Sequence, residues 1–271
     1  MRKSLNTSDS KWYDNLWAAL IFFTRLPLWR IHQPPRKSYS AVVEYWPLAG
    51  WITGGVMAAV LYLGSMVLPY PVAVLMAIAS RLFLTGALHE DGLCDFFDGF
   101  GGGGDSRERI LLIMKDSRIG TYGVIGLLIY VLLLAACLHY LTPKLAAITI
   151  LAADPFSKMV AGQIIMMLPY ARNEEEAKNR TVYRRMNTSA AIGLAIQGFI
   201  PLGVYIWLVG GQIDWRVVIF APCIVMYFLY LLIWKRLRGY TGDCCGALCL
   251  LVELTFYIAV CGTIYYKAIS M

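Results

Sequence analysis

The chain has 271 residues, of which 59% are apolar and only 15% are charged. Soluble domains are about 45–50% apolar and about 25% charged, so a soluble globule is excluded. A disordered chain is also excluded, because disorder requires low hydrophobicity and high net charge. The net charge of +7 is better explained by basic loops on one side of a membrane than by nucleic-acid binding. The sequence therefore predicts an integral membrane protein that lies in a lipid bilayer and binds no nucleic acid.

The first predicted element is a short N-terminal helix. Leu16, Trp17, Leu20 and Phe23 recur at helical spacing within residues 15–23. This segment is too short to cross a hydrocarbon core of about 30 Å. It therefore predicts an amphipathic helix that lies on the membrane surface.

Seven apolar segments follow, each long enough to cross the bilayer as a helix. They cover residues 42–68, 72–88, 123–141, 145–169, 190–209, 217–234 and 246–265. Each span must be helical, because a lone strand would leave its backbone groups unpaired in lipid. The predicted fold class is all-α. It is a single integral membrane domain over residues 1–271, a polytopic helix bundle with about seven transmembrane helices plus the N-terminal amphipathic helix.

Basic residues are distributed unevenly between alternate loops. One set of loops holds 19 of the 24 Lys and Arg residues, and it comprises residues 1–41, 89–122, 170–189 and 235–245. The opposite set holds three, and it comprises residues 69–71, 142–144, 210–216 and the C-terminal tail. Because Lys and Arg accumulate in cytoplasmic loops, the first set is predicted to be cytoplasmic and the C-terminus external.

The most informative stretch, residues 89–122, begins with His89-Glu90-Asp91-Gly92-Leu93-Cys94-Asp95-Phe96-Phe97-Asp98-Gly99. Asp91, Asp95 and Asp98 are spaced i, i+4 and i+7, so they share one face of a helix. A divalent cation would relieve their mutual repulsion, and carboxylate oxygens suit Mg²⁺. Phe96 and Phe97 argue against a fully solvated acidic face. The three aspartates are therefore predicted to bind Mg²⁺.

Two further motifs follow within the same stretch. Residues 99–105 read Gly-Phe-Gly-Gly-Gly-Gly-Asp, and such a run can direct backbone N–H groups at an anion or act as a hinge. Both alternatives stay open. Lys115 and Arg118 flank Asp116 shortly before a span. Because Arg can grip phosphate through two parallel hydrogen bonds, the pair predicts a phosphate clamp in preference to an anchor at lipid headgroups.

Charged residues near or within the later spans also need explanation. Asp243 lies at the cytoplasmic start of the last span, where it is either a metal or substrate contact or a helix N-cap. Asp154 and Lys158 are spaced i, i+4 inside a span. They either neutralise one another or line a polar cavity.

The two central motifs together resemble the cobalamin synthase family, whose members are also called adenosylcobinamide-GDP ribazoletransferases. The resemblance extends over residues 16–258, and its other matches are Thr24-Arg25-Leu26-Pro27, Pro47-Leu48-Ala49-Gly50 and residues 239–247. The chain departs from the family at Cys94, where a small residue such as Ala is expected. It also departs at Lys158, near which many relatives carry an Arg.

The resemblance implies a Mg²⁺-dependent enzyme of the cytoplasmic (inner) membrane whose active site faces the cytoplasm. It would join α-ribazole, or its 5′-phosphate, to adenosylcobinamide-GDP with release of GMP in cobalamin biosynthesis. The expected catalytic residues are His89, Asp91, Lys115, Asp116 and Arg118. The expected substrate-binding residues are Arg25, Gly120, Thr121, Lys158 and Asp243. Either His89 or a carboxylate would accept the hydroxyl proton.

Two alternative functions fit the sequence less well. A CDP-alcohol phosphotransferase also uses an aspartate-rich helix, but its signature places Ala-Arg shortly after Asp-Gly, where this chain has Leu93-Cys94-Asp95. A transporter is disfavoured because no inverted repeat is visible and the motifs lie on one side of the membrane. The sequence is compatible with a homo-oligomer.

Overall fold

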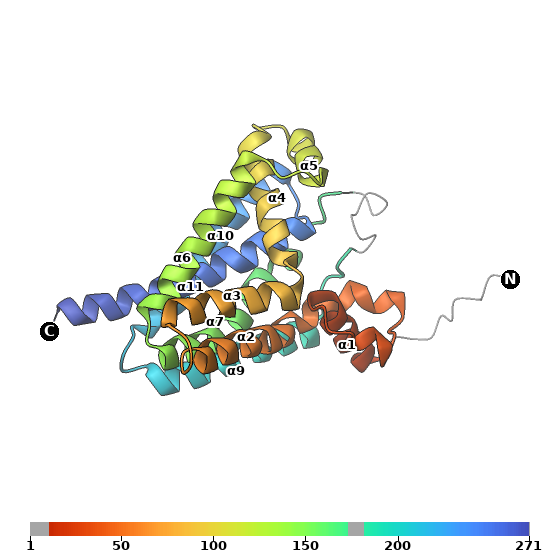
Figure 1. The fold of residues 1–271 in the computed structure, drawn as a ribbon. Coiled ribbons are helices and arrows are strands. Elements are labelled where there is room, and N and C mark those ends of the chain that lie inside the picture. Colours follow the sequence, from red (N-terminus) through yellow and green to blue (C-terminus); the bar gives the residue numbers. More distant parts are fainter. Residues whose placement is uncertain (1–10, 173–181, 271) are drawn as a thin grey trace.

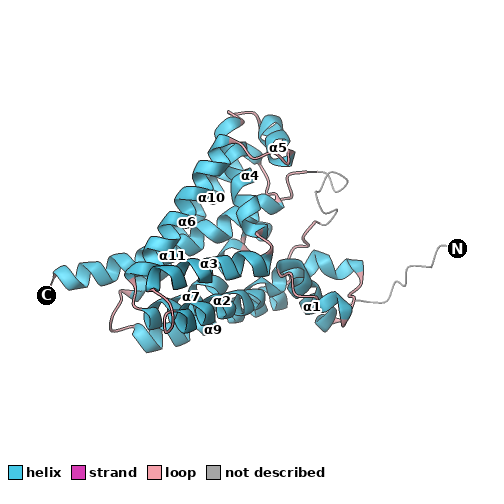
Figure 2. Cartoon of the chain, in the orientation of Figure 1, coloured by secondary structure: helices cyan, strands magenta, loops and turns pink. Residues whose placement is uncertain are grey.

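The computed structural model describes residues 11–172 and 182–270, which are helical almost throughout (Figure 2). The elements in chain order are α1 (Trp12–Phe23), η1 (Leu28–Arg30), η2 (Arg36–Tyr45), α2 (Trp46–Gly64), α3 (Tyr70–Thr85), α4 (Leu88–Gly102), α5 (Arg107–Lys115), α6 (Thr121–Tyr140), α7 (Pro143–Ala161), α8 (Ile164–Met167), α9 (Thr188–Val209), α10 (Trp215–Leu237) and α11 (Gly242–Ile269). No strand occurs in these two ranges, whose β pairing is limited to an isolated bridge between Tyr170 and Tyr240. The predicted all-α class is confirmed.

Six helical segments of the described chain are long and apolar enough to cross a membrane. They are Arg36–Gly64, Thr121–Tyr140, Pro143–Met167, Thr188–Val209, Trp215–Leu237 and Gly242–Ile269. Their ends are set by local signals. The side chains of Thr142, Asn187 and Thr241 cap the first turns of α7, α9 and α11, as expected for residues that satisfy unpaired N–H groups. The polytopic membrane bundle predicted from the sequence is therefore present.

The second predicted span, residues 72–88, differs from its prediction. The chain forms α3 over 16 residues and then turns by 91° into α4, so a seventh span exists only if this bent pair is counted as one. The turn falls at Gly86 and Ala87, which adopt left-handed backbone angles with φ of 65° and 55°. Glycine adopts this conformation without strain. The apolar run therefore continues past the point where the helix direction changes.

Helices α7 and α11 form the centre of the bundle. Buried residues make up 83% of the apolar window of the α7 span and 72% of that of α11, but only 22% in α6 and α10. The outer helices therefore present apolar side chains to lipid, while the central pair carries the interior. Figure 1 shows α7 lying alongside α2 and α9, and α11 lying between this layer and α6 and α10.

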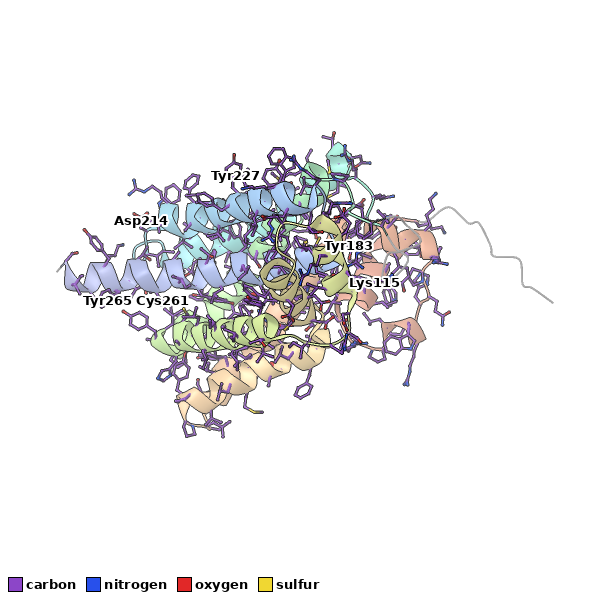
Figure 3. The ribbon with its side chains drawn as sticks, turned by 90° about the horizontal axis from the view of Figure 1, so that it is seen from above. Lys115, Tyr183, Asp214, Tyr227, Cys261 and Tyr265 are labelled. Atoms are coloured by element: carbon purple, nitrogen blue, oxygen red, sulfur yellow. The ribbon has the colours of Figure 1, made fainter. Side chains whose placement is uncertain are left out.

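The ends of the helices divide the molecule into two sides. Helices α2, α6, α9 and α11 begin on the side where the α7–α8 segment and α10 end, and α1 and α5 lie on this same side (Figure 1). Figure 3 shows Lys115 and Tyr183 at this end of the molecule and Asp214 and Tyr265 at the other. The predicted N-terminal helix is present as α1, and its Ala18 and Phe23 are buried.

Candidate active site

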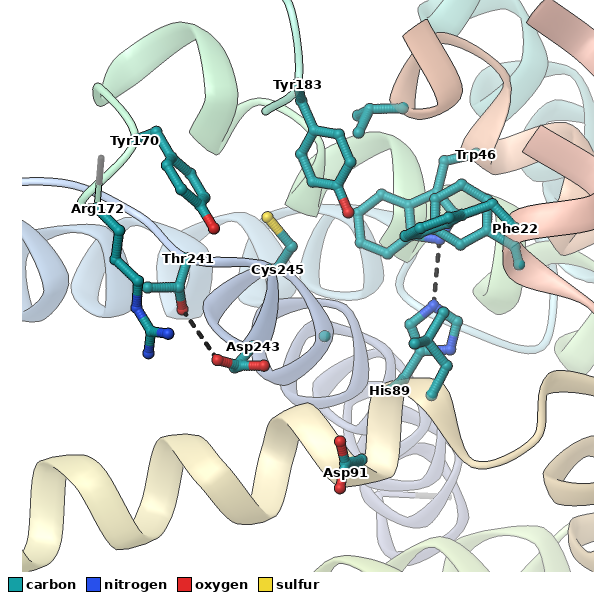
Figure 4. Close-up of a pocket in the computed structure, with 15 residues that line it drawn as sticks. Phe22, Trp46, His89, Asp91, Tyr170, Arg172, Tyr183, Thr241, Asp243 and Cys245 are labelled. Carbon is teal, nitrogen blue, oxygen red and sulfur yellow. Dashed lines mark hydrogen bonds between the residues drawn. The ribbon is translucent and has the colours of Figure 1, made fainter. Parts of the chain in front are cut away.

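A pocket of about 220 Å³ opens on the side of the molecule where α2 and α11 begin. It is lined by residues of α1, η2, α2, α4 and α11 and of the segments around residues 170 and 183. Three of the predicted site residues line it: His89, Asp91 and Asp243. In Figure 4, Asp91 on α4 and Asp243 at the start of α11 face the same space.

Glycines let α4 and α11 approach closely beside this pocket. A Cβ atom on Gly92 would lie 3.1 Å from the Asp243 Cα, and one on Gly246 would lie 3.1 Å from the His89 carbonyl oxygen. Because glycine has no Cβ, the two backbones can touch. This contact brings together two carboxylates, those of Asp91 and Asp243, that are 152 positions apart in the sequence.

A second close contact positions Arg172 in the pocket wall. The Tyr240 N–H donates to the Pro169 carbonyl oxygen at 2.9 Å, and the Ala171 N–H donates to the Tyr240 carbonyl oxygen at 2.8 Å. A Cβ on Gly239 would lie only 2.8 Å from that Pro169 oxygen, so only glycine allows this pairing without a shift of the backbone. Arg172 therefore lies near Asp243 in the pocket (Figure 4).

His89 belongs to an aromatic stack at the other end of the pocket. The Phe23 and Trp46 rings are stacked with centroids 5.2 Å apart, and the Trp46 and His89 rings are stacked at 5.7 Å. The Trp46 indole N–H donates to His89 Nε2 at 3.3 Å. Since that nitrogen already accepts a hydrogen bond and His89 is only 4% exposed, His89 is poorly placed to take a proton from a substrate.

The three aspartates of the predicted metal cluster have different surroundings. Asp91 is exposed in the pocket, Asp95 is half-buried one turn along α4, and Asp98 is buried. The Asp98 carboxylate accepts backbone N–H bonds from Gly120 at 2.7 Å and Gly123 at 2.8 Å. Asp98 thereby caps the start of α6. In the described ranges, no three His, Cys, Asp or Glu side chains converge on a metal position.

The glycine-rich run is a packing surface. Residues 99–102 complete α4. A Cβ on Gly99 would lie 2.5 Å from the Met114 side chain of α5, and one on Gly101 would lie 2.6 Å from the Tyr122 ring. The missing side chains allow α5 and the start of α6 to pack on the end of α4. Neither open alternative, an anion site or a hinge, is needed to explain the run.

The loop before α6 holds the remaining residues of the central motif. Arg118 pairs with Asp116 at 2.7 Å on the surface, and this hydrogen bonding lowers the pKa of Asp116 to about 2. Lys115 lines a separate groove with Arg107 and Arg172. The predicted clamp of Lys115 and Arg118 is therefore not assembled within the described pocket. Gly120 donates to Asp98, as noted above, and Thr121 is exposed at the start of α6.

Lys158 lies inside the bundle and does not line the pocket. It is 2% exposed and forms an ion pair with Asp154, which also accepts a hydrogen bond from Thr53 at 2.9 Å. Next to this pair, Arg81 Nη1 lies 2.5 Å from Glu253 Oε1 and 3.9 Å from Asp154 Oδ2. Of the two alternatives for this pair, the structure shows that Asp154 and Lys158 neutralise one another.

Arg25 also lies outside the pocket lining. Its backbone N–H donates to the Leu84 carbonyl oxygen at 2.7 Å, and its guanidinium contacts Gly86. A side chain at position 86 would collide with it. The exposed Arg25 therefore lies against the corner where α3 turns into α4.

Comparison with known proteins decides the family. The model of the cobalamin-5-phosphate synthase family matches residues 15–261. The chain belongs to this family. The family predicted from the central motifs is therefore confirmed, and the chain is an enzyme of cobalamin synthesis.

Several curated relatives of the chain carry the name adenosylcobinamide-GDP ribazoletransferase. The relative from Leptothrix cholodnii is 37% identical over 260 residues, which are 92% of this chain and 95% of that protein. The Ralstonia pickettii protein is 35% identical and the Leptospira interrogans protein 31% identical, with 92% and 97% of their lengths covered. No solved structure gives a significant match.

Sequence reasoning missed several pocket residues, among them Phe22, Trp46, Tyr170, Arg172 and Tyr183. Tyr170, Arg172 and Tyr183 belong to residues 170–189, which the sequence analysis used only as a basic loop. Trp46 lies near the start of a predicted span. The one available signal is that Arg172 follows Pro169 and Tyr170 shortly after a helix, a pattern too common to indicate a site.

The position of Asp98 leads to a prediction. The Asn side chain has one carbonyl oxygen, so Asp98→Asn leaves one of the two N–H groups at the start of α6 without its acceptor. We expect a loss of about 1–3 kcal/mol in the free energy of unfolding, measured as a lower thermal unfolding temperature in detergent. The Mg²⁺ concentration required for half-maximal activity should stay as in the wild type. A raised requirement with unchanged stability would return Asp98 to the metal site.

Proposed function

We propose that the chain joins α-ribazole, or its 5′-phosphate, to adenosylcobinamide-GDP and releases GMP, and that the pocket between α4 and α11 is where this occurs. The observation that carries the assignment is the placement of Asp91, Asp243 and Arg172 on one pocket, within a chain whose relatives are named for this activity. Two carboxylates and a guanidinium are suited to a pyrophosphate and its counter-ion.

The reaction is a displacement at phosphorus. A ribazole hydroxyl oxygen forms a bond to the phosphorus that stays on the cobinamide side, and the bond from this phosphorus to the bridging oxygen breaks. GMP leaves with that oxygen. Such transfers depend on alignment and charge neutralisation more than on covalent catalysis. The hydroxyl proton passes to a pocket carboxylate, because Nε2 of His89 is occupied by Trp46.

The donor set of the pocket fits Mg²⁺. This ion is usually held by one or two carboxylates together with substrate phosphates and water, so Asp91 and Asp243 would suffice without a third protein ligand. When bound, Mg²⁺ would polarise the phosphate oxygens and stabilise leaving GMP. Arg172 would bind the non-bridging oxygens in a bidentate manner. Lys115, in the groove that shares Arg172, adds positive charge nearby.

The direct test uses purified protein in detergent with adenosylcobinamide-GDP, α-ribazole and Mg²⁺. We expect GMP and a cobalamin to appear in equal amounts, and neither without the metal. Supplying α-ribazole 5′-phosphate in parallel identifies the preferred acceptor. Folded protein that releases no GMP with either acceptor would exclude this function.

We further propose that the pocket faces the cytoplasm and that the bilayer is the inner membrane. The asymmetry of basic residues supports this orientation, because the loops rich in Lys and Arg lie on the pocket side. The relevant helix ends, with Lys115 and Tyr183, lie opposite Tyr265 near the C-terminus (Figure 3).

This orientation predicts the labelling of single added cysteines. A membrane-impermeant maleimide added to intact cells should modify Ser270→Cys and leave Asp105→Cys unmodified until the membrane is opened. Both positions are exposed, and the wild-type chain, with its seven cysteines, provides the background signal. Labelling of Asp105→Cys alone from outside would invert the topology.

A further inference from the structure

The pocket has two chemically distinct ends. One end contains Asp243 and Arg172, with Tyr170 beside them, and the other is bounded by the aromatic rings of Phe22, Phe23, Trp46 and Tyr183 (Figure 4). Figure 4 shows Tyr183 and Phe22 close together near Trp46, with Arg172 and Asp243 on the far side. A ligand that fills this pocket therefore needs a flat apolar part joined to an anionic part.

The aromatic end is held in place from several directions. The Phe22 and Tyr183 rings meet edge to face with centroids 6.3 Å apart, and Tyr183 stacks on Tyr240 at 6.5 Å with planes 7° apart. The residue after Tyr183, Arg184, makes a bidentate ion pair with Glu44 at 2.7 and 2.9 Å. The ring of Tyr183 is thus set in position before any ligand arrives.

The phenol groups add polarity without charge. Tyr170 and Tyr183 direct their hydroxyl groups toward the pocket (Figure 4). Burial raises the pKa of both phenols, so both keep their protons at neutral pH and can donate a hydrogen bond. A planar base with one ring-nitrogen acceptor and an apolar rim matches rings of this kind.

Guanine matches this end poorly. Its edge carries several donors and acceptors, and each one buried among Phe22, Phe23 and Trp46 without a partner costs about 1–3 kcal/mol. Asp243 and Arg172, which could pair with this edge, are at the other end of the pocket (Figure 4). A substituted benzimidazole has no such polar edge. The chemistry of the walls therefore favours the base of the acceptor nucleoside over the base of the leaving nucleotide.

A groove on the other side of Arg172 offers a separate place for the nucleotide. It is lined by three basic side chains and one carboxylate, those of Arg107, Lys115, Arg172 and Glu108, and by Leu111, Leu112 and Ala171. The guanidinium of Arg172 has one donor bonded to the Leu111 carbonyl oxygen at 3.1 Å, whereas its buried Nε has no protein partner in the described chain. Arg172 is thus shared by the two cavities.

We propose that the pocket and the groove are separate acceptor and donor subsites that meet at Arg172. The benzimidazole of α-ribazole lies against the rings of Phe22 and Tyr183 in the pocket, and the guanylate portion of the donor lies along the groove by Lys115. This assignment rests on the proposed function. It makes Phe22 and Tyr183 specificity-determining residues for the acceptor base.

The test compares Tyr183→Leu with Lys115→Ala. In Tyr183→Leu, we expect KM for α-ribazole to rise about tenfold or more, because stacking on an aromatic ring is lost, with KM for adenosylcobinamide-GDP within about twofold of wild type. Lys115→Ala should show the reverse pattern. Tyr183→Phe keeps the ring and should stay within about threefold for both substrates. Tyr227→Leu on the exposed face of α10 is the matched control.

Calorimetric titration of α-ribazole alone gives a readout independent of turnover. Wild type should bind it, and Tyr183→Leu should weaken the Kd by the same factor as the KM. A rise in the donor KM in Tyr183→Leu, or displacement of bound α-ribazole by GMP, would place guanine in the pocket and overturn the assignment. If wild type binds α-ribazole but releases no GMP in the full assay, the proposed function fails and the binding assignment stands.

Discussion

Replacement of Asp91 by Asn is expected to reduce transfer by about a hundredfold or more, equivalent to about 2.7 kcal/mol of activation free energy. The change keeps the size of the side chain and removes one of the two carboxylates that line the pocket. The Mg²⁺ concentration for half-maximal rate should rise, because a negatively charged oxygen ligand is lost. Asp243→Asn should behave in the same way, since its carboxylate faces the same space.

A control variant and a binding measurement test whether the effect of Asp91→Asn comes from the pocket. Asp105→Asn makes the same chemical change at an exposed position outside the pocket and should leave rate and Mg²⁺ dependence unchanged. Calorimetric titration with Mg²⁺ in the presence of GMP should show weaker binding by Asp91→Asn. Because Asp91 is exposed, the thermal stability of the metal-free protein should change little. Full activity with an unaltered Mg²⁺ response would remove Asp91 from the site.

The largest effect on stability is expected for Arg81→Met. Arg81 is 3% exposed and donates to Glu253 at 2.5 Å and to the Tyr130 hydroxyl at 2.8 Å. Removing the guanidinium leaves the buried Glu253 carboxylate without its cation. Breaking a buried ion pair in this way costs about 3–5 kcal/mol of folding free energy. The expected result is a large fall in the thermal unfolding temperature and in the yield of folded protein.

Two variants check the cause of that loss. Arg81→Met combined with Glu253→Gln removes the uncompensated charge as well and should recover part of the stability. Arg109→Met changes an exposed arginine of α5 and should unfold like the wild type. If Arg81→Met retains wild-type stability, the buried charges contribute little to the fold.

The sequence predicted the class of fold because long apolar runs and basic loops are direct consequences of the bilayer. The predicted end of the second span was wrong because the hydrophobicity of a segment does not indicate where a helix changes direction. The chain stays apolar through residues 72–88, yet Gly86 and Ala87 turn it by 91°. The glycine was visible, but a glycine in a membrane helix is common enough to carry little information.

The site was predicted only in part, for a similar reason. Asp91 and Asp243 were identified from their motifs, and the structure brings them together through the contact between α4 and α11. Asp98 shares a helix face with Asp91 but is engaged by the N–H groups of Gly120 and Gly123. Helical spacing indicates which side chains share one face of a helix. It does not indicate which groups of a neighbouring helix form hydrogen bonds with those side chains.

The shortness of α3 has a consequence for the surrounding lipid. Its 16 residues extend about 24 Å at about 1.5 Å per residue, less than the hydrocarbon thickness of about 30 Å. Such mismatch is relieved when the bilayer thins around the helix, at a cost of fractions of a kcal/mol per Å. A bilayer thinned around α3 would bring the headgroup layer toward the corner at Gly86, close to the start of α4 at Leu88. The position of α4 would then depend on the acyl-chain length of the lipid.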